Sequence, residues 1–482
     1  MTDFISRVLK YQKPSNMLDE ENHSSPLSHG APMSKQQTRK VALAGGIGTT
    51  VEWYDFFVYG TAAGLVFNDL FFPEFDSLIG TLLSFATFSI AFVARPLGGV
   101  IFGHFGDRIG RKSMLVITLT VMGLSTLGIA LLPTYQTIGV LAPILLVALR
   151  FTQGLALGGE IGGAILMVVE HAPPGRRGFY GSWVQMGVPA GLMLGNAVFL
   201  LMAGLSPEAF QLWGWRIPFF IGGVFVVIGL FIRLHVGESP DFEELKKKSH
   251  LERLPIAVVI RKYPKQLILT CGAYFAIGVT FYGATVFGLS YGVSLGFSRN
   301  EMLAMVLIAM AVTFVVLPVF GKLSDRYGRR PIYLIGVTAM LLFTFPWFWL
   351  LNSGSFVLAL FGFVVFCIAF SCSYGPLAAF FAESFDTKIR YTGISFGYTI
   401  GTMASSAPAP IVATYLLAKT GSYEAIAVFM VAMCLVSVVC VLLMKETYRV
   451  AYGVADESSA GNAETPQGSS PAENQIARNV HE

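Results

Sequence analysis

Several ionisable side chains lie inside long apolar stretches of this sequence, where burying a charge is costly. On the first stretch, Glu52, Asp55 and Tyr59 are separated by three and four residues, which places them on one face of a helix. Two carboxylates one turn apart repel each other when both are ionised, so we expect one to hold a proton near neutral pH. We predict that Glu52 or Asp55 takes up and releases a proton. The alternative is that the acid forms a structural hydrogen bond to a neighbouring helix.

Arginine and glutamine side chains in two other stretches can recognise an anion. Arg95 lies in the second stretch, and Arg150, Gln153 and Glu160 share one broad face of the fourth. A guanidinium group binds a carboxylate through two parallel hydrogen bonds. We therefore predict that these four residues contact an anionic or zwitterionic substrate. Alternatively, a neighbouring acid neutralises either arginine, which is then structural or part of a proton path.

The second half of the chain is poorer in buried charge and offers tyrosines instead. Tyr274 and Tyr282 lie in the seventh apolar stretch, and Tyr374 lies in the tenth. Together with Tyr59 they can present hydroxyl groups to a substrate, or they can line helix interfaces with one polar tip. We include all four as candidate substrate contacts.

The elements that must position these residues are membrane helices. Hydrophobic residues make up 54% of the chain and charged residues 13%, whereas a soluble domain carries about 25% charged residues. The chain therefore cannot cover a surface that faces water. Twelve apolar runs follow, and each has the roughly 20 residues that a spanning helix needs. They lie at residues 41–66, 78–103, 113–132, 139–170, 180–203, 216–236, 265–290, 301–321, 331–351, 355–383, 391–417 and 424–444.

These runs predict an all-α membrane protein with two six-helix halves. We assign residues 39–236 to the first half and 264–445 to the second. The charged segment 237–263 is expected to join them, and its EELKKK sequence suits a short amphipathic helix on the membrane surface. The polar ends, 1–38 and 446–482, are expected to be disordered tails. The small-residue segment ASSAPAP at 404–410 is expected to break or kink the eleventh helix.

A charged motif occurs once in each half. Residues 103–112 read GHFGDRIGRK and residues 321–330 read GKLSDRYGRR. We predict that each copy is a tight loop between two membrane helices, because its glycines permit a turn. A motif repeated in this way indicates two similar halves, which is typical of a transporter. The candidate gating residues of the motif are Gly103, Asp107, Arg108, Arg111, Asp325, Arg326 and Arg329.

A second pair of charges repeats at a similar spacing. Glu170 precedes Arg177 by seven residues, and Glu383 precedes Arg390 by seven residues. Loops with opposite charges can lock one face of a transporter when that face is closed, so we add these four residues to the gating set. The alternative is a set of independent surface ion pairs, each of which contributes little.

Lysine and arginine are concentrated in alternate loops, which predicts the orientation of the chain. By the positive-inside rule these loops and both termini are cytoplasmic. The basic residues concerned are Arg108, Arg111, Lys112, Arg176, Arg177, Lys246, Lys247, Lys248, Arg253, Arg261, Lys262, Lys322, Arg326, Arg329, Arg330, Lys388 and Arg390.

Other function classes find little support in the sequence. It contains no HExxH, Walker-type or CxxC motif, so we expect no enzyme, no ATP-driven pump, no metal and no other cofactor. The five cysteines occur singly in apolar runs, which argues against a disulfide framework. With 33 basic and 29 acidic residues, the net charge is too small to suggest a nucleic-acid partner.

The repeated motif resembles the loops between helices 2 and 3 and between helices 8 and 9 of the major facilitator superfamily. Five further segments resemble its metabolite:proton symporter family, which includes carriers of shikimate, 2-oxoglutarate, citrate and proline/betaine. They are VEWYDFFVYG (51–60), FVARPLGGVIFGHFGDRIGRK (92–112), RFTQGLALGGEIGGA (150–164), EHAPPGRRGFYGSW (170–183) and WGWRIPFF (213–220). The resemblance covers roughly residues 40–447.

This resemblance implies a proton-coupled symporter that imports a small organic acid by alternating access. It also implies a monomer in the lipid bilayer of the bacterial inner membrane, with loop motifs that govern the change of conformation. A symporter of a zwitterion such as proline or betaine is the alternative within the family. Outside the family, the alternatives are a channel, a membrane enzyme or a sensor. None of these classes needs a gating motif in each half together with an isolated pair of acidic residues on the first helix.

Overall fold

The computed structural model describes residues 35–109, 111–158, 160–173, 175–202, 204–235, 255–385 and 389–448. In these ranges all regular structure is helical and no strand occurs, which confirms the predicted fold class. Most of both predicted tails and of the central segment, including EELKKK, lies outside the described residues.

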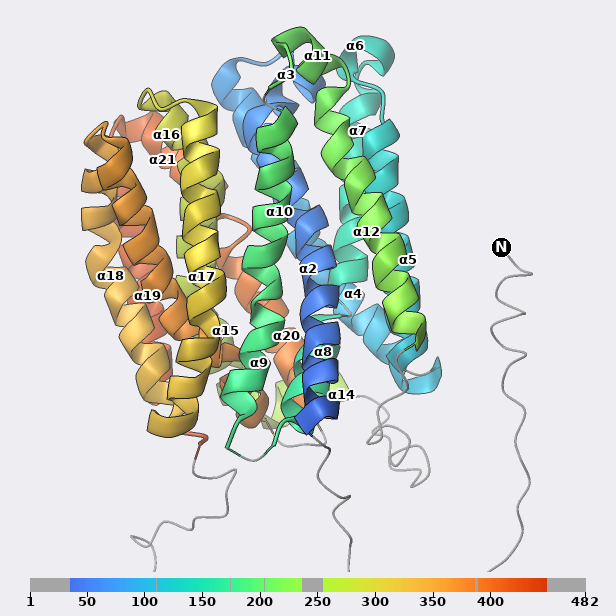
Figure 1. The fold of residues 1–482 in the computed structure, drawn as a ribbon, viewed down its shortest axis with the longest axis vertical. Helices are drawn as coiled ribbons and strands as arrows, with labels where there is room; N and C mark the ends of the chain where they lie inside the picture. Colours follow the sequence, from blue (N-terminus) through green and yellow to red (C-terminus); the bar gives the residue numbers. More distant parts are fainter. Residues whose placement is uncertain are drawn as a thin grey trace, which may run out of the picture. The chain divides into compact units, whose positions relative to one another are not determined.

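The first group of helices contains six long elements, two of them interrupted. They are α2 (Lys35–Leu65), α4 (Ser77–Ile109), α5 (Arg111–Leu131), α7 (Leu141–Gly158) with α8 (Ile161–His171), α9 (Arg177–Gln185) with α10 (Gly187–Met202), and α12 (Ile217–His235). Short helices lie in the connections: α3 (Phe67–Phe71), α6 (Tyr135–Ile138), α11 (Pro207–Leu212) and the 3-10 turn Gly214–Arg216. In Figure 1, α5, α7 and α12 lie side by side, and α2 and α10 pack together nearer the second group.

The second group repeats this plan after a short helix, α14 (Pro255–Lys262). Its elements are α15 (Pro264–Tyr282) with a π-helical turn (Gly283–Phe287) and α16 (Gly288–Ser294), α17 (Arg299–Tyr327), α18 (Arg329–Asn352), α19 (Phe356–Glu383), α20 (Arg390–Ser405) with α21 (Ala409–Thr420), and α22 (Glu424–Leu443). Figure 1 shows α17, α18 and α19 together on the side away from α5 and α12. The groups meet where α17 and α19 contact α9 and where α20 contacts α4.

The long helices have the length and surface of membrane spans. Ten of the described helical stretches are long and apolar enough to cross a bilayer. The helix α2 and the apolar part of α5, Val116–Leu131, account for the remaining two predicted runs. Large apolar side chains such as Leu201, Leu342 and Val357 are mostly exposed on these helices, as expected for a surface that faces lipid tails.

Both copies of the repeated motif are more helical than predicted. The helix α4 continues to Ile109 and α5 begins at Arg111, while α17 continues to Tyr327 and α18 begins at Arg329. In the second copy the chain turns at a single residue, Gly328, whose φ of 105° lies in the left-handed region that favours glycine. The prediction of a loop over the whole motif was therefore wrong, because one glycine is enough to reverse the chain.

Four predicted helices are interrupted in the described residues: the fifth run divides at Met186, between α9 and α10, and the other three are described in turn. The break expected near 404–410 is confirmed, since α20 ends at Ser405 and α21 begins at Ala409 after Pro408. The carbonyl of Ala407, freed by this break, accepts a hydrogen bond from Ser89 of α4. The fourth run divides at Glu160, which precedes α8. The seventh run loosens into the π-helical turn directly after Tyr282, a form that occurs often at functional sites.

Glycines bring α4 and α7 into close contact. Added Cβ atoms at Gly154 and Gly158 would overlap the backbone of Ala91 and Arg95. Because both positions require glycine, the helices approach each other closely enough for Arg95 and Arg150 to lie in one layer of the protein.

Candidate functional site

Asp55 lies at the centre of the first helix group and is 1% exposed. One carboxylate oxygen, Oδ2, accepts a hydrogen bond of 2.9 Å from the hydroxyl of Thr126 on α5. The other, Oδ1, has no hydrogen-bond partner in the described part of the chain. It faces Gly222 of α12, where an added Cβ would overlap it. Oδ2 is therefore the oxygen at which a protonated Asp55 has an acceptor for its O–H, the Thr126 hydroxyl, whereas a proton on Oδ1 would have no acceptor among the described residues.

A chain of hydrogen bonds connects this acid to an arginine on another helix. Gln153 Nε2 donates to Thr126 Oγ1 at 2.8 Å, and Arg150 Nη1 donates to Gln153 Oε1 at 2.6 Å. Asp55, Thr126, Gln153 and Arg150 thus form one path from α2 through α5 to α7, which we call the Asp55–Arg150 chain. All four residues are buried. The structure therefore links a predicted proton-coupling acid to two of the predicted substrate contacts.

Arg150 lies among aromatic rings rather than beside a carboxylate. Its Cζ atom is 4.0 Å from the ring centre of Tyr59, 4.5 Å from Phe56 and 5.3 Å from Phe88. Such contacts attract a cation to the faces of the rings. The Tyr59 hydroxyl donates to Thr87 Oγ1 at 2.7 Å, which fixes its ring. Arg150 Nε and Nη2 have no hydrogen-bond partner in the described residues.

Arg95 occupies a similar aromatic environment and shares the ring of Phe56 with Arg150. Its Cζ atom lies 4.6 Å from the ring centre of Phe92, 4.7 Å from Phe56 and 5.4 Å from Trp53. Its Nε and Nη1 atoms also lack a hydrogen-bond partner among the described residues. Two buried guanidinium groups near one ring therefore retain unused N–H donors, which is costly unless a ligand or water uses them.

The second helix group adds Tyr282 to this aromatic cluster. Its ring centre lies 5.3 Å from that of Phe92 and 5.8 Å from that of Phe88. Its buried hydroxyl has no hydrogen-bond partner in the part of the chain that the structure describes. Tyr282, a predicted substrate contact, therefore lies beside rings that surround Arg95 and Arg150, at the boundary between the two helix groups.

The other predicted tyrosines lie deeper in the second group. Tyr274 donates a 3.2 Å hydrogen bond to the hydroxyl of Tyr398. The ring of Tyr374 packs against Phe370, whose ring lies 4.9 Å from that of Phe281 beside Tyr282. Both side chains are buried and continue the aromatic cluster away from the arginines.

Glu52 and Glu160 are also buried, at 3% and 1% exposure. Glu160 lies at the interruption between α7 and α8 rather than within the one continuous helix that the apolar run predicted, and its role as a substrate contact stays a prediction. Burial does not separate Glu52 from Asp55. The hydrogen-bond path to Arg150 singles out Asp55 as the better candidate for the coupling acid.

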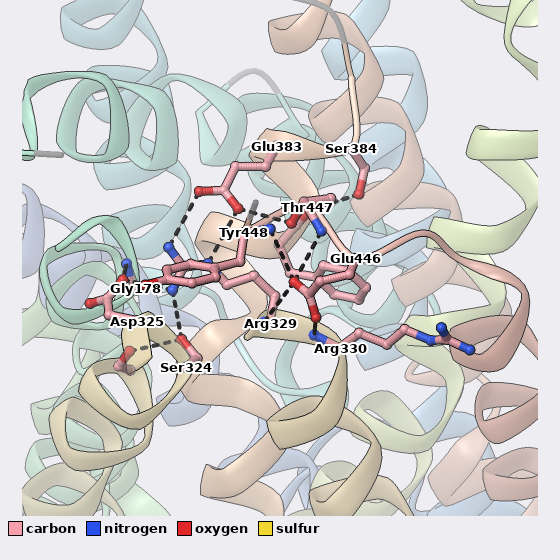
Figure 2. A network of polar contacts seen from close by, with 12 residues as sticks. Gly178, Ser324, Asp325, Arg329, Arg330, Glu383, Ser384, Glu446, Thr447 and Tyr448 are labelled. Atoms are coloured by element: carbon pink, nitrogen blue, oxygen red, sulfur yellow. Dashed lines mark hydrogen bonds and ion pairs between the residues drawn. The ribbon is translucent and has the colours of Figure 1, made fainter. Parts of the chain in front are cut away.

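At the end of the protein that holds the repeated motif, Asp325 joins the two helix groups (Figure 2). Its Oδ1 accepts a hydrogen bond from the backbone N–H of Gly178, and its Oδ2 accepts one from Phe179, both at 2.8 Å. These amides belong to the first turn of α9, whose N-terminus favours negative charge. A residue of the second motif copy therefore caps a helix of the first group.

Arg329 holds this aspartate and a second acid together. It donates through Nη1 to Asp325 at 2.6 Å, and through Nε and Nη2 to the two oxygens of Glu383 at 3.2 and 3.3 Å. Arg329 is fully buried, so both pairs are shielded from water. We call Asp325, Arg329, Glu383 and their partners the motif-end network (Figure 2).

The segment after α22 completes the motif-end network. Glu446 accepts hydrogen bonds from the backbone N–H groups of Arg329 at 2.9 Å and Arg330 at 3.0 Å, and so caps α18. Thr447 donates to Glu383 at 2.9 Å. Sequence reasoning placed Glu446 at the start of a tail and missed its role, because a single acid beyond a helix end carries no distinguishing pattern.

The remaining gating candidates divide into three sets. Arg390 forms an ion pair of 3.6 Å with Glu170, which joins the second group to the first. Arg177 begins α9, and Arg326 is exposed and lies over the ring of Tyr327. The side chains of Gly103, Asp107, Arg108 and Arg111 lie outside the described residues, so their role stays a prediction.

Thr126 was also missed by the sequence analysis. It lies in an apolar run beside Ser125, and threonines in helices commonly bond to the carbonyl four residues earlier. No pattern in the sequence therefore distinguishes it from Thr120, whose hydroxyl bonds, among the described residues, only to the carbonyl of Val116.

Comparison with known proteins agrees with this architecture. A family model described as Major Facilitator Superfamily matches residues 46–407. The inner membrane metabolite transport protein YhjE of Escherichia coli (strain K12) is 40% identical over 444 residues, which cover 90% of this chain and 99% of that protein. The shikimate transporter of the same strain is 38% identical, covering 86% of this chain and 97% of the relative. Its proline/betaine transporter is 35% identical, covering 85% of this chain and 84% of the relative.

Solved structures show the same fold. The proton:xylose symporter XylE, bound to 6-bromo-6-deoxy-D-glucose, superposes with a TM-score of 0.69 at 18% identity, covering 86% of this chain and 97% of that one. The chain is a multi-pass membrane protein and not an enzyme. The matched family, the full-length relatives and the helical architecture together show that it is a transporter that belongs to the major facilitator superfamily.

Proposed function

We propose that this transporter is a proton-coupled symporter that imports a small organic acid by alternating access. The observation that supports this most directly is the pair of buried arginines, Arg95 and Arg150, with unused N–H donors around Phe56. A carboxylate entering between the helix groups would satisfy these donors. One of the arginines is also linked by hydrogen bonds to the buried acid Asp55.

The proton has a defined role in this proposal. Asp55 is buried, so its ionised form is costly, and a proton from one side of the membrane neutralises it. The Asp55–Arg150 chain then passes the change of charge to the arginine that binds the substrate. Glu52 on the same face of α2 supplies a second acid for the path.

The motif-end network acts as the cytoplasmic gate in the same proposal. Asp325 holds the N-terminus of α9, and Arg390 holds Glu170 beside α9, so both contacts join the two halves. Breaking them would separate the halves at this end. With both termini cytoplasmic and the halves at residues 39–236 and 264–445, this end faces the cytoplasm of a cell whose inner membrane holds the protein.

A zwitterion such as betaine or proline is the second candidate substrate. It is favoured by the rings of Trp53, Phe56 and Phe92, since aromatic faces attract quaternary ammonium groups. However, the guanidinium of Arg95 already lies over these three rings. A second cation at the same faces would be repelled, which favours the organic acid.

Uptake by cells expressing the protein would test the proposal. We would supply labelled monocarboxylates, dicarboxylates, shikimate, proline and betaine, each with and without a protonophore. We expect accumulation of an organic acid that the protonophore abolishes, and loss of that uptake in Arg150→Gln. Arg299→Gln, an exposed arginine at the start of α17, is the matched control. Accumulation of betaine or proline alone, or accumulation that survives the protonophore, would contradict the proposal.

A further inference from the structure

We propose that Thr126 is a positioning residue that transmits the protonation state of Asp55 to Arg150. The inference rests on the proposed function, because it assumes that Asp55 is the proton-coupling acid. It adds a residue and a direction of signal to that function. The hydroxyl of Thr126 forms hydrogen bonds with both the carboxylate of Asp55 and the amide of Gln153.

The hydroxyl of Thr126 has two acceptors in reach but one hydrogen to donate. Asp55 Oδ2 lies at 2.9 Å, and the backbone carbonyl of Met122, one turn earlier on α5, lies at 3.1 Å. The oxygen of the hydroxyl also accepts from Gln153 Nε2 at 2.8 Å. A hydroxyl can donate once and accept twice. Thr126 can therefore adopt two hydrogen-bonding states without moving its helix.

The charge on Asp55 selects between these states. When Asp55 is ionised, the charge-assisted bond is the stronger one, so Thr126 donates to Asp55. When Asp55 gains a proton on Oδ2, its own O–H donates to Thr126, and the threonine hydrogen turns to the Met122 carbonyl. The hydroxyl oxygen then accepts from both Asp55 and Gln153.

Sharing this oxygen loosens the bond that orients Gln153. Gln153 Oε1 accepts a hydrogen bond from Arg150 Nη1. A change in the orientation of the Gln153 amide therefore weakens its hydrogen bond to the Arg150 guanidinium. Protonation of Asp55 thus makes an N–H of Arg150 Nη1 available to a carboxylate, in addition to the N–H groups of Nε and Nη2. The proton and the organic acid then bind in a favoured order, with the proton first.

The other charged and titratable groups near Asp55 define the competing explanation. They are Glu52, Tyr54 and Tyr59 on α2, Arg150 on α7, Arg95 on α4 and Tyr282 on α15. A direct electrostatic attraction between Asp55 and Arg150 would couple them without any help from Thr126. The two explanations differ in what happens when the hydroxyl is removed.

Infrared titration of the purified full-length protein separates these explanations without a substrate. The carbonyl band of a protonated carboxyl, taken as the difference between the parent and Asp55→Asn, reports the proton on Asp55. Thr126→Val removes a hydrogen bond to the ionised acid and therefore favours the proton. We expect the midpoint of the titration to move up by about one pH unit or more. Thr126→Ser keeps the hydroxyl and should keep the parental midpoint.

Thr120→Val is the matched control, because within the described part of the chain the Thr120 hydroxyl bonds only to the Val116 carbonyl of its own helix. A double-mutant cycle then tests the link to the arginine. Gln153→Met should move the midpoint in the parent but not in Thr126→Val, where the path is already broken. If Thr126→Val does not fold, Thr126→Ala removes the same hydroxyl with a smaller side chain.

The outcomes distinguish this inference from the proposed function. A parental midpoint in Thr126→Val, or an effect of Gln153→Met that persists in Thr126→Val, would show that Thr126 does not transmit the signal, while Asp55 remains the coupling acid. The absence of any Asp55-dependent band would overturn Asp55 as the coupling acid, and both proposals with it.

Discussion

Replacing Asp325 with asparagine should open the end of the protein that holds the motif-end network. Asp325 accepts two backbone N–H groups of α9 and the guanidinium of Arg329. Asparagine keeps one acceptor oxygen and no charge, so at least one backbone bond and the charge pairing are lost. Hydrogen bonds to a charged group contribute about 1.5–3 kcal/mol each. We expect the closed arrangement to lose about 3 kcal/mol, which is roughly a 100-fold change in the ratio of closed to open states.

Cysteine labelling measures this change directly. Ser182 on α9 is fully buried, and its side chain lies against Gly321 of α17. Ser182→Cys, in a protein whose five natural cysteines are replaced, should react slowly with a polar maleimide when the halves are closed. Adding Asp325→Asn should raise the labelling rate by up to about 100-fold, since the rate follows the open population.

Asp76 provides a matched control for this experiment. It also accepts two backbone N–H bonds, from Leu78 and Ile79, but all three residues belong to the first helix group. Asp76→Asn should leave the labelling of Ser182→Cys unchanged. Equal labelling with and without Asp325→Asn, or an equal rise with Asp76→Asn, would refute the view that Asp325 holds the halves together.

Three further predictions concern the acid, the arginine and the cap of α18. Asp55→Asn should abolish proton-driven accumulation while exchange of substrate across the membrane continues; loss of both in counterflow assays would indicate a structural role. Arg150→Lys keeps the charge but loses the planar guanidinium, so substrate binding measured by calorimetry should weaken by about 1.5–3 kcal/mol; parental affinity with lost coupling would leave Arg95 as the anion site. Glu446→Ala removes the cap of α18 and should lower the free energy of unfolding by about 1–2 kcal/mol, whereas an unchanged midpoint of thermal unfolding would contradict that role.

The helices could be predicted from the sequence because lipid imposes a simple rule on length and polarity. Runs of apolar residues marked the spans, and Pro408 and Pro410 marked the break between α20 and α21. Turns were less predictable. The motif at 321–330 has the composition of a loop, yet one glycine with positive φ reverses the chain and leaves the rest helical.

The site could be predicted in part. Charged and amide side chains inside apolar runs drew attention to Asp55, Arg95, Arg150 and Gln153, all of which are buried, because such residues are rare and costly in a membrane. Their connections depend on tertiary packing. Nothing in the sequence shows that Thr126 on a third helix joins two of them, since its partners are 71 and 27 residues away.

The motif-end network shows the same limit. The repeated charges drew attention to Asp325, Arg329 and Glu383, but they did not show which of these residues pair with one another. In the structure Glu383 binds Arg329, and Arg390 binds Glu170 of the other half. Charge repeats therefore indicate which residues belong to a network, whereas the fold decides which of them meet.

Proton movement during transport tests the central claim most directly. The purified protein would be placed in liposomes that contain a pH-sensitive dye, and the organic acid found by the uptake panel would be added outside. We predict that its entry acidifies the interior in the parent but not in Asp55→Asn. Entry of the acid without acidification in the parent, or entry that requires sodium instead of a proton gradient, would contradict the account.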